Sequence, residues 1–66
     1  QGLDRMAQKV GEEGVETVIA AKNPDDQALL GEAADLLFHL MVLLRARGLG
    51  LDAVVRLLER RHAPGP

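Results

Sequence analysis

Five acidic residues in two clusters are the side chains of this sequence best suited to chemistry. Glu12, Glu13 and Glu16 have the spacing E-E-x-x-E, and Glu32 and Asp35 follow with the spacing E-x-x-D. Steps of three and four residues place side chains on one face of an α-helix, so each cluster points in one direction. Grouped carboxylates repel one another and resist burial unless a cation lies between them. A divalent metal is the simplest such cation.

A turn between two helices is predicted to bring the clusters together. Proline disfavours helical geometry in the residue before it, so Asn23 ends one helix and can cap the next, with Pro24 at its first position. The helices then form an antiparallel hairpin.

The register of this hairpin predicts which acids lie level. In a hairpin folded about Pro24, residues whose numbers sum to about 48 lie side by side. Glu16 is then expected level with Glu32, and Glu13 level with Asp35. The two clusters are therefore predicted to form one metal site.

Three helices are predicted from apolar residues that recur at steps of three and four. They should run from about Leu3 to Lys22, from about Asp25 to Arg47 with Gly48 as a left-handed end, and from about Leu51 to Arg61. The expected core stripe of the first helix, with its acids on the opposite side, consists of Leu3, Met6, Val10, Gly14, Thr17 or Val18, and Ala21.

The second helix is predicted to be the central one. Apolar residues cover most of its circumference, and its main polar stripe consists of Glu32, Asp35 and His39. Such a helix is enclosed by its neighbours, and three helices can hardly enclose it, so a partner subunit is expected. The predicted fold is an all-α hairpin plus a third helix, completed to a bundle by homodimerisation, with one domain over 1–62 and a disordered tail over 63–66.

The composition agrees with such a bundle. The chain has 66 residues, is 47% apolar, contains Phe38 as its one aromatic residue and has no cysteine. The net charge of −2 gives no basic field for nucleic acid, and the apolar run 36–44 is about half of what a bilayer requires. We expect a cytoplasmic protein that binds neither nucleic acid nor membrane.

A solvated helix face is the alternative interpretation of the first acidic cluster. Lys9 lies three and four residues before Glu12 and Glu13, a common surface arrangement. The second cluster favours the metal site, because Glu32 and Asp35 belong to a helix with little other polar surface.

Oxygen ligands alone favour a hard cation, so Mg²⁺ is expected, with Mn²⁺ as a possible substitute. Mg²⁺ commonly shares its remaining positions with water and substrate phosphates, which makes phosphoanhydride hydrolysis the reaction this arrangement suits. Lys9 and Lys22 are candidate phosphate ligands, although either can be an ordinary surface lysine. His39 lies four residues after Asp35 and could orient that carboxylate, or be a satisfied core histidine.

Three stretches carry a family resemblance: Lys9-Val-Gly-Glu-Glu-Gly-Val-Glu-Thr-Val-Ile-Ala-Ala, Gly31-Glu-Ala-Ala-Asp-Leu-Leu-Phe-His-Leu-Met-Val-Leu-Leu and Arg45-Ala-Arg-Gly-Leu. They closely resemble phosphoribosyl-ATP pyrophosphohydrolase of histidine biosynthesis, within the all-α nucleoside triphosphate pyrophosphatases related to MazG and to dimeric dUTPases. The acidic spacing is shared across that superfamily, whereas K-V-G-E-E and A-D-L-L-F-H-L are narrower. Gly14 departs from the family, which usually has alanine there.

The resemblance implies cleavage of phosphoribosyl-ATP into phosphoribosyl-AMP and pyrophosphate. It also implies another helical segment before the position of Gln1. Mg²⁺ would be held by the acids at Glu12, Glu13, Glu16, Glu32 and Asp35. Among these, Glu13, Glu16 and Asp35 are the predicted catalytic residues.

Two rival functions stay open. One is a MazG-like enzyme that hydrolyses free nucleoside triphosphates, and it differs only in the pocket for base and ribose. The other is a non-catalytic helical dimerisation module whose acids bind metal or solvent alone.

Overall fold

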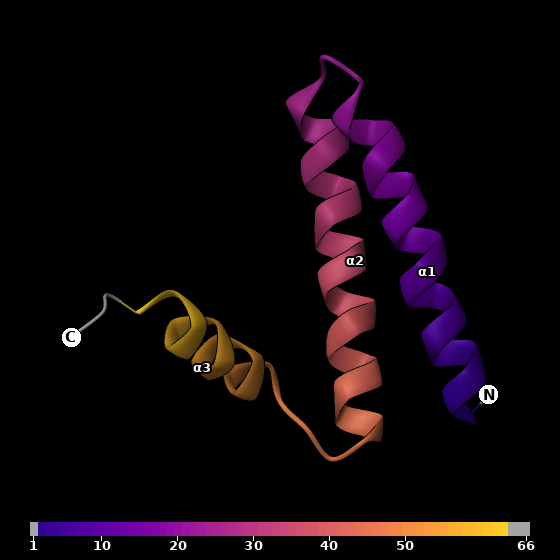
Figure 1. The fold of residues 1–66 in the computed structure, drawn as a ribbon. Coiled ribbons are helices and arrows are strands. Elements are labelled where there is room, and N and C mark those ends of the chain that lie inside the picture. The colour runs from indigo at the N-terminus through magenta and orange to yellow at the C-terminus, as the bar shows by residue number, and fades with distance from the viewer. Residues whose placement is uncertain (1, 64–66) are drawn as a thin grey trace.

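The computed structural model describes residues 2–63, which form three α-helices and no strand. Helix α1 is Gly2–Ala21, α2 is Asp26–Ala46 and α3 is Leu51–His62. The all-α prediction is confirmed, and every predicted helix end lies at or next to the observed one. Figure 1 shows α1 and α2 side by side and antiparallel, with α3 leaving from the far end of α2. Of the predicted disordered tail, residues 64–66 lie outside the described residues.

The N-cap of α2 lies two residues later than predicted. Asp25, not Asn23, is the N-cap of α2, and its side chain accepts a hydrogen bond from the backbone N–H of Gln27 at 3.0 Å. The Oδ1 of Asn23 instead accepts from the N–H of Asp25 at 2.9 Å. This hydrogen bond closes an Asx turn over residues 23–25, in which the asparagine side chain pairs with the backbone N–H two residues later. Pro24 therefore lies in the turn, outside the helix.

Helix α2 ends at Ala46, and Gly48 supplies the left-handed conformation that closes it, as predicted. Gly48 has a φ of +74°, its N–H donates to the carbonyl of Arg45 at 2.9 Å, and the N–H of Leu49 donates to the carbonyl of Leu44 at 2.8 Å. This pair of bonds is the Schellman closure of a helix. It turns the chain away from the hairpin before α3 begins.

The contact between α1 and α2 uses a different face of α1 from the predicted stripe. The two buried residues of the described chain are Ala20 and Glu13, at 8% and 7% exposure. Thr17 lies between them and donates its hydroxyl to the carbonyl of Glu32 at 3.3 Å. The small side chains of Thr17 and Ala20 allow the helices to approach, so the face that carries them is the inner one.

The prediction that the acids lie opposite the core is therefore wrong for Glu13. It is also wrong to place Leu3, Val18 and Ala21 in the core, because all three are exposed. The first helix carries apolar residues on two faces, and periodicity alone does not tell them apart. The outer face exposes Val15 and Val18.

The single chain covers its apolar surface incompletely. Its radius of gyration is 14.2 Å, against about 11 Å for a compact chain of this length. Its accessible surface is 5217 Å², against about 4,100 Å² for a compact monomer of 7.1 kDa. Within the single chain none of the residues of α2 is buried, and Leu30, Leu37, Phe38 and Met41 are exposed, so its enclosure by a partner subunit stays a prediction.

Helix α2 is also long and apolar enough to cross a membrane by length and composition, with 21 residues and a hydropathy of 1.5. This corrects the estimate from the sequence, which counted only residues 36–44. Core helices of soluble proteins meet the same criterion. Glu32 and Asp35 lie within α2, and acidic side chains are costly inside a bilayer.

Candidate metal centre

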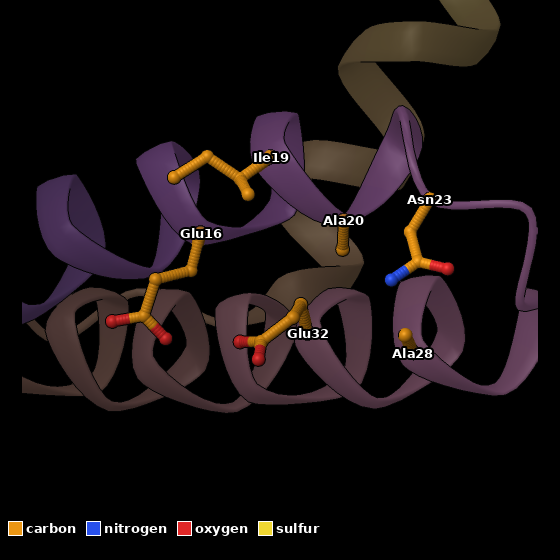
Figure 2. Close-up of a pocket in the computed structure, with 6 residues that line it drawn as sticks. All are labelled: Glu16, Ile19, Ala20, Asn23, Ala28 and Glu32. Atoms are coloured by element: carbon orange, nitrogen blue, oxygen red, sulfur yellow. The ribbon is translucent and has the colours of Figure 1, made fainter.

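Three carboxylates from two helices meet in the inter-helix contact. One oxygen each of Glu13, Glu16 and Glu32 lies within 4.8 Å of the other two. Glu13 and Glu16 are one turn apart on α1, and Glu32 reaches them from α2. In Figure 2 the carboxylates of Glu16 and Glu32 lie next to each other between the helices, as the hairpin register predicts.

Two of these carboxylates have buried oxygens that no described residue satisfies. The Oε1 atoms of Glu13 and Glu32 are buried and have no hydrogen-bond partner within residues 2–63. An ionised carboxylate without a partner is costly to bury. Glu13 on α1 and Glu32 on α2 each have an unsatisfied buried oxygen, and both belong to the group of three carboxylates. An all-oxygen donor set of this kind fits a hard divalent cation.

The local electrostatics agree with this fit. Burial raises the pKa of Glu32 above its ordinary value, and a hydrogen bond with Glu16 together with the charges of Glu16, Glu13 and Asp35 raises it further. The charges of the neighbouring acids thus act on Glu32 in the same direction as its burial. A bound cation would reverse this effect.

Lys9 lies beside the first acidic cluster. Its ammonium is 3.7 Å from Oε1 of Glu12 and 3.9 Å from Oε2 of Glu13, and its side chain is 31% exposed. A hydrogen bond from Gln8, at 2.9 Å, is the main cause that lowers the pKa of Glu12, with Lys9 contributing. Glu12 is thus paired with neutral and basic neighbours on its own helix and lies outside the group of three carboxylates.

The other predicted site residues lie at the edge of the group. Asp35 is exposed and is not one of the three, yet its charge is close enough to act on Glu32. His39 packs edge-on against Phe38, with ring centroids 5.3 Å apart. It makes no hydrogen bond to Asp35 in the described part of the chain. Lys22 is exposed at the end of α1.

A cleft continues from the acids toward the turn. Its volume is about 260 Å³. The residues that line it are Glu16, Ile19, Ala20, Asn23, Ala28 and Glu32. The sequence motifs indicated neither Ile19 nor Ala28 as a site residue and indicated Asn23 only as a cap. The hairpin register does place Ala20 level with Ala28, and two alanines side by side leave room between helices.

Comparison with known proteins agrees with the motifs. The family model of phosphoribosyl-ATP pyrophosphohydrolase matches residues 1–62. The chain belongs to this family. The resemblance inferred from the sequence is therefore confirmed.

Two kinds of relative are similar to this chain. The histidine biosynthesis bifunctional protein HisIE of Xanthomonas axonopodis pv. citri is 69% identical over 62 residues, which are 94% of this chain and 30% of the relative. The phosphoribosyl-ATP pyrophosphatase of Erythrobacter litoralis is 61% identical over 62 residues, 94% of this chain and 60% of the relative. That of Sphingopyxis alaskensis is 58% identical, over 57% of its length. The chain thus spans less than two thirds of each of these relatives.

Proposed function

We propose that this protein hydrolyses phosphoribosyl-ATP to phosphoribosyl-AMP and pyrophosphate, a step of histidine biosynthesis, in the cytoplasm. The family match and the names of its relatives support the substrate. The observation that carries the chemistry is the pair of unsatisfied buried oxygens of Glu13 and Glu32. In the reaction the oxygen of a water molecule bonds to the α phosphorus and the bond from that phosphorus to the bridging oxygen breaks. Pyrophosphate leaves with the bridging oxygen, and the protons of the water pass to a carboxylate and then to solvent.

We propose Mg²⁺ as the cofactor, with Mn²⁺ as a substitute. Glu13, Glu16 and Glu32 would hold it, with Glu12 and Asp35 at the edge of the site. A bound divalent cation neutralises phosphate charge and lowers the pKa of coordinated water.

The chain's own residues would then divide the remaining work. Glu13, Glu16 and Asp35 are the proposed catalytic carboxylates, and an exposed one such as Asp35 can accept a proton from the attacking water. Lys9 is the basic side chain next to the acids and would bind a substrate phosphate, with Lys22 as the more distant candidate.

The functional form is proposed to be a homodimer or a higher homo-oligomer. The chain exposes roughly 1,100 Å² more than a compact monomer of its mass, which exceeds the about 800 Å² that each partner buries in a standard interface. Leu30, Ala34, Leu37 and Met41 form an exposed stripe on α2 at coiled-coil spacing. We call this set the α2 stripe.

Charge favours an antiparallel pairing of two α2 stripes. The chain up to Asp35 has eight acidic and three basic residues, and the remainder has two acidic and five basic ones. Pairing about the midpoint between Ala34 and Leu37 would place Asp26 level with the partner's Arg45. Opposite charges then meet at both ends of the stripe.

A substrate panel tests the proposed function. Pyrophosphate release from phosphoribosyl-ATP and from free nucleoside triphosphates would be compared in the complete protein, with and without Mg²⁺. We expect Mg²⁺-dependent release and a preference for phosphoribosyl-ATP. A preference for free triphosphates would favour the MazG-like alternative, and no release from any substrate would favour a dimerisation module.

A further inference from the structure

We infer that the cleft between Glu32 and the α1–α2 turn holds the nucleoside part of the substrate, with the side-chain amide of Asn23 as a hydrogen-bond donor to it. This inference rests on the proposed function, because it assumes that the substrate's phosphates lie at the three carboxylates. It assigns Asn23, Ile19 and Ala28 to substrate binding.

The cleft has the position and size that such a group requires. Glu16 and Glu32 form one end, and Asn23 lies at the other (Figure 2). Its volume of about 260 Å³ is just below the range of about 300–1,000 Å³ that is usual for whole small-molecule sites. It therefore suits a portion of a nucleotide that continues from a phosphate group at the acids.

The lining of the cleft favours an uncharged group. No basic side chain is among its lining residues, so the cleft does not attract a phosphate. Ile19, Ala20 and Ala28 supply apolar surface instead. A ribose or a purine has apolar faces and polar edges, which match an apolar wall that ends in an amide.

The orientation of Asn23 is fixed by the turn itself. Its Oδ1 accepts the N–H of Asp25 at 2.9 Å. Because this bond identifies the oxygen, the other arm of the amide is the NH₂ group, and Figure 2 shows that it points toward the inter-helix space on the side of Glu32. The donor is thus positioned before substrate arrives, which reduces the entropy lost on binding. It would donate to a ribose oxygen or to a ring nitrogen of a purine.

Asn23→Asp tests the donor without breaking the turn. The aspartate keeps an oxygen for the N–H of Asp25 but has no NH₂ group. We expect KM for phosphoribosyl-ATP to rise about three- to tenfold, which is the usual loss of affinity when one hydrogen bond is removed. The inhibition constant of pyrophosphate should stay unchanged. Gln27→Glu is the matched control, because it makes the same amide-to-carboxylate change at an exposed position outside the cleft and should leave both constants as they are.

Ile19→Ala tests the apolar wall separately. Ile19 is 66% exposed, so its truncation removes a cleft wall without opening a cavity in a core. KM should again rise severalfold while pyrophosphate inhibition stays the same, since pyrophosphate has no nucleoside. Wild-type KM in both variants would overturn the inference. So would a parallel weakening of pyrophosphate in Asn23→Asp, since the effect would then be electrostatic repulsion of phosphate. An unaltered protein that releases no pyrophosphate would instead refute the proposed function.

Discussion

The ammonium of Lys9 lies 3.9 Å from Oε2 of Glu13, whose other oxygen is buried and unsatisfied. Glu13 is thus neutralised on one side only. The lysine partly compensates the charge of Glu13, while the other oxygen of that carboxylate has no partner among the described residues.

Lys9→Met should separate two roles of this lysine. Removing a positive charge beside the carboxylates should tighten Mn²⁺ binding severalfold, because the ion no longer faces a like charge. The same variant should raise KM for phosphoribosyl-ATP if Lys9 also binds phosphate. Calorimetric Mn²⁺ titration without substrate and steady-state kinetics measure the two effects, with the exposed Arg60→Met in α3 as a control. Unchanged metal affinity would show that Lys9 is too well solvated to act on the site.

Asp35→Asn should abolish pyrophosphate release while the helix content stays unchanged. The exposed Asp35 makes no hydrogen bond or ion pair within the described residues, so its amide analogue should not disturb the fold. Circular dichroism measures the helix content, and a pyrophosphate assay measures the loss of activity. Glu59→Gln, a comparable exposed change on α3, should retain activity. Turnover at the unaltered rate in Asp35→Asn would contradict the catalytic role of this acid.

Acidification should stabilise the metal-free hairpin through Glu32. The pKa of Glu32 is raised above 4.5, so the folded chain binds this proton more tightly than the unfolded chain. The contribution of Glu32 to the free energy of unfolding therefore grows as the pH falls through its folded pKa toward 4.5. It is lost as the pH rises again through the folded pKa. Thermal unfolding in a chelator at several pH values measures this, and Glu32→Gln should remove it.

Glu12 should change stability with pH in the opposite direction to Glu32 in the same experiment. Its pKa is lowered, chiefly by the hydrogen bond from Gln8, so its contribution is present above 4.5 and is lost as the pH falls through its folded pKa. Glu12→Gln should remove that loss at low pH. If the two variants changed the pH profile in the same direction, the assigned causes of these shifts would be wrong.

Leu37→Asp should dissociate the proposed dimer. Leu37 is 45% exposed in the single chain and lies in the middle of the α2 stripe, where a charge would be buried in the interface. Sedimentation should show a monomer. The exchange Asp26→Arg with Arg45→Asp tests the antiparallel arrangement, because each single change should weaken association and the pair should restore it. Failure of the pair to restore association would exclude this register.

Gly14→Ala should stabilise the fold. A Cβ at Gly14 would meet no neighbouring atom within 4 Å among the described residues, so no contact there requires a glycine. Alanine in a helix interior is favoured by about 1 kcal/mol over glycine. Denaturant unfolding measures the gain. A loss of stability that depends on protein concentration would instead place Gly14 in the contact between subunits.

The hairpin and the meeting of Glu16 with Glu32 could be predicted from the sequence, because Pro24 fixes the turn and antiparallel helices have one register. The face of α1 that packs against α2 could not be predicted from the sequence. Apolar residues occupy two sides of that helix, and the choice between them depends on which side lets α2 approach. The burial of Glu13 follows from the side chosen.

The cleft and the start of α2 depended on details that periodicity does not contain. The N–H of Asp25 donates a hydrogen bond to Oδ1 of Asn23, and this bond decides where α2 begins and which way the amide of Asn23 points. Asp25 and Asn23 are both good capping residues, so composition alone did not distinguish them.

The three carboxylate oxygens belong to both helices, and this has a consequence for folding. An ion held by Glu13 and Glu32 together can bind only when the hairpin is closed, so its binding free energy adds to the free energy of unfolding. Because only Ala20 and Glu13 are buried in the described part of the chain, few other contacts stabilise the closed hairpin. The concentration of free divalent cation would then set how much of the protein is folded, besides how much of it is active.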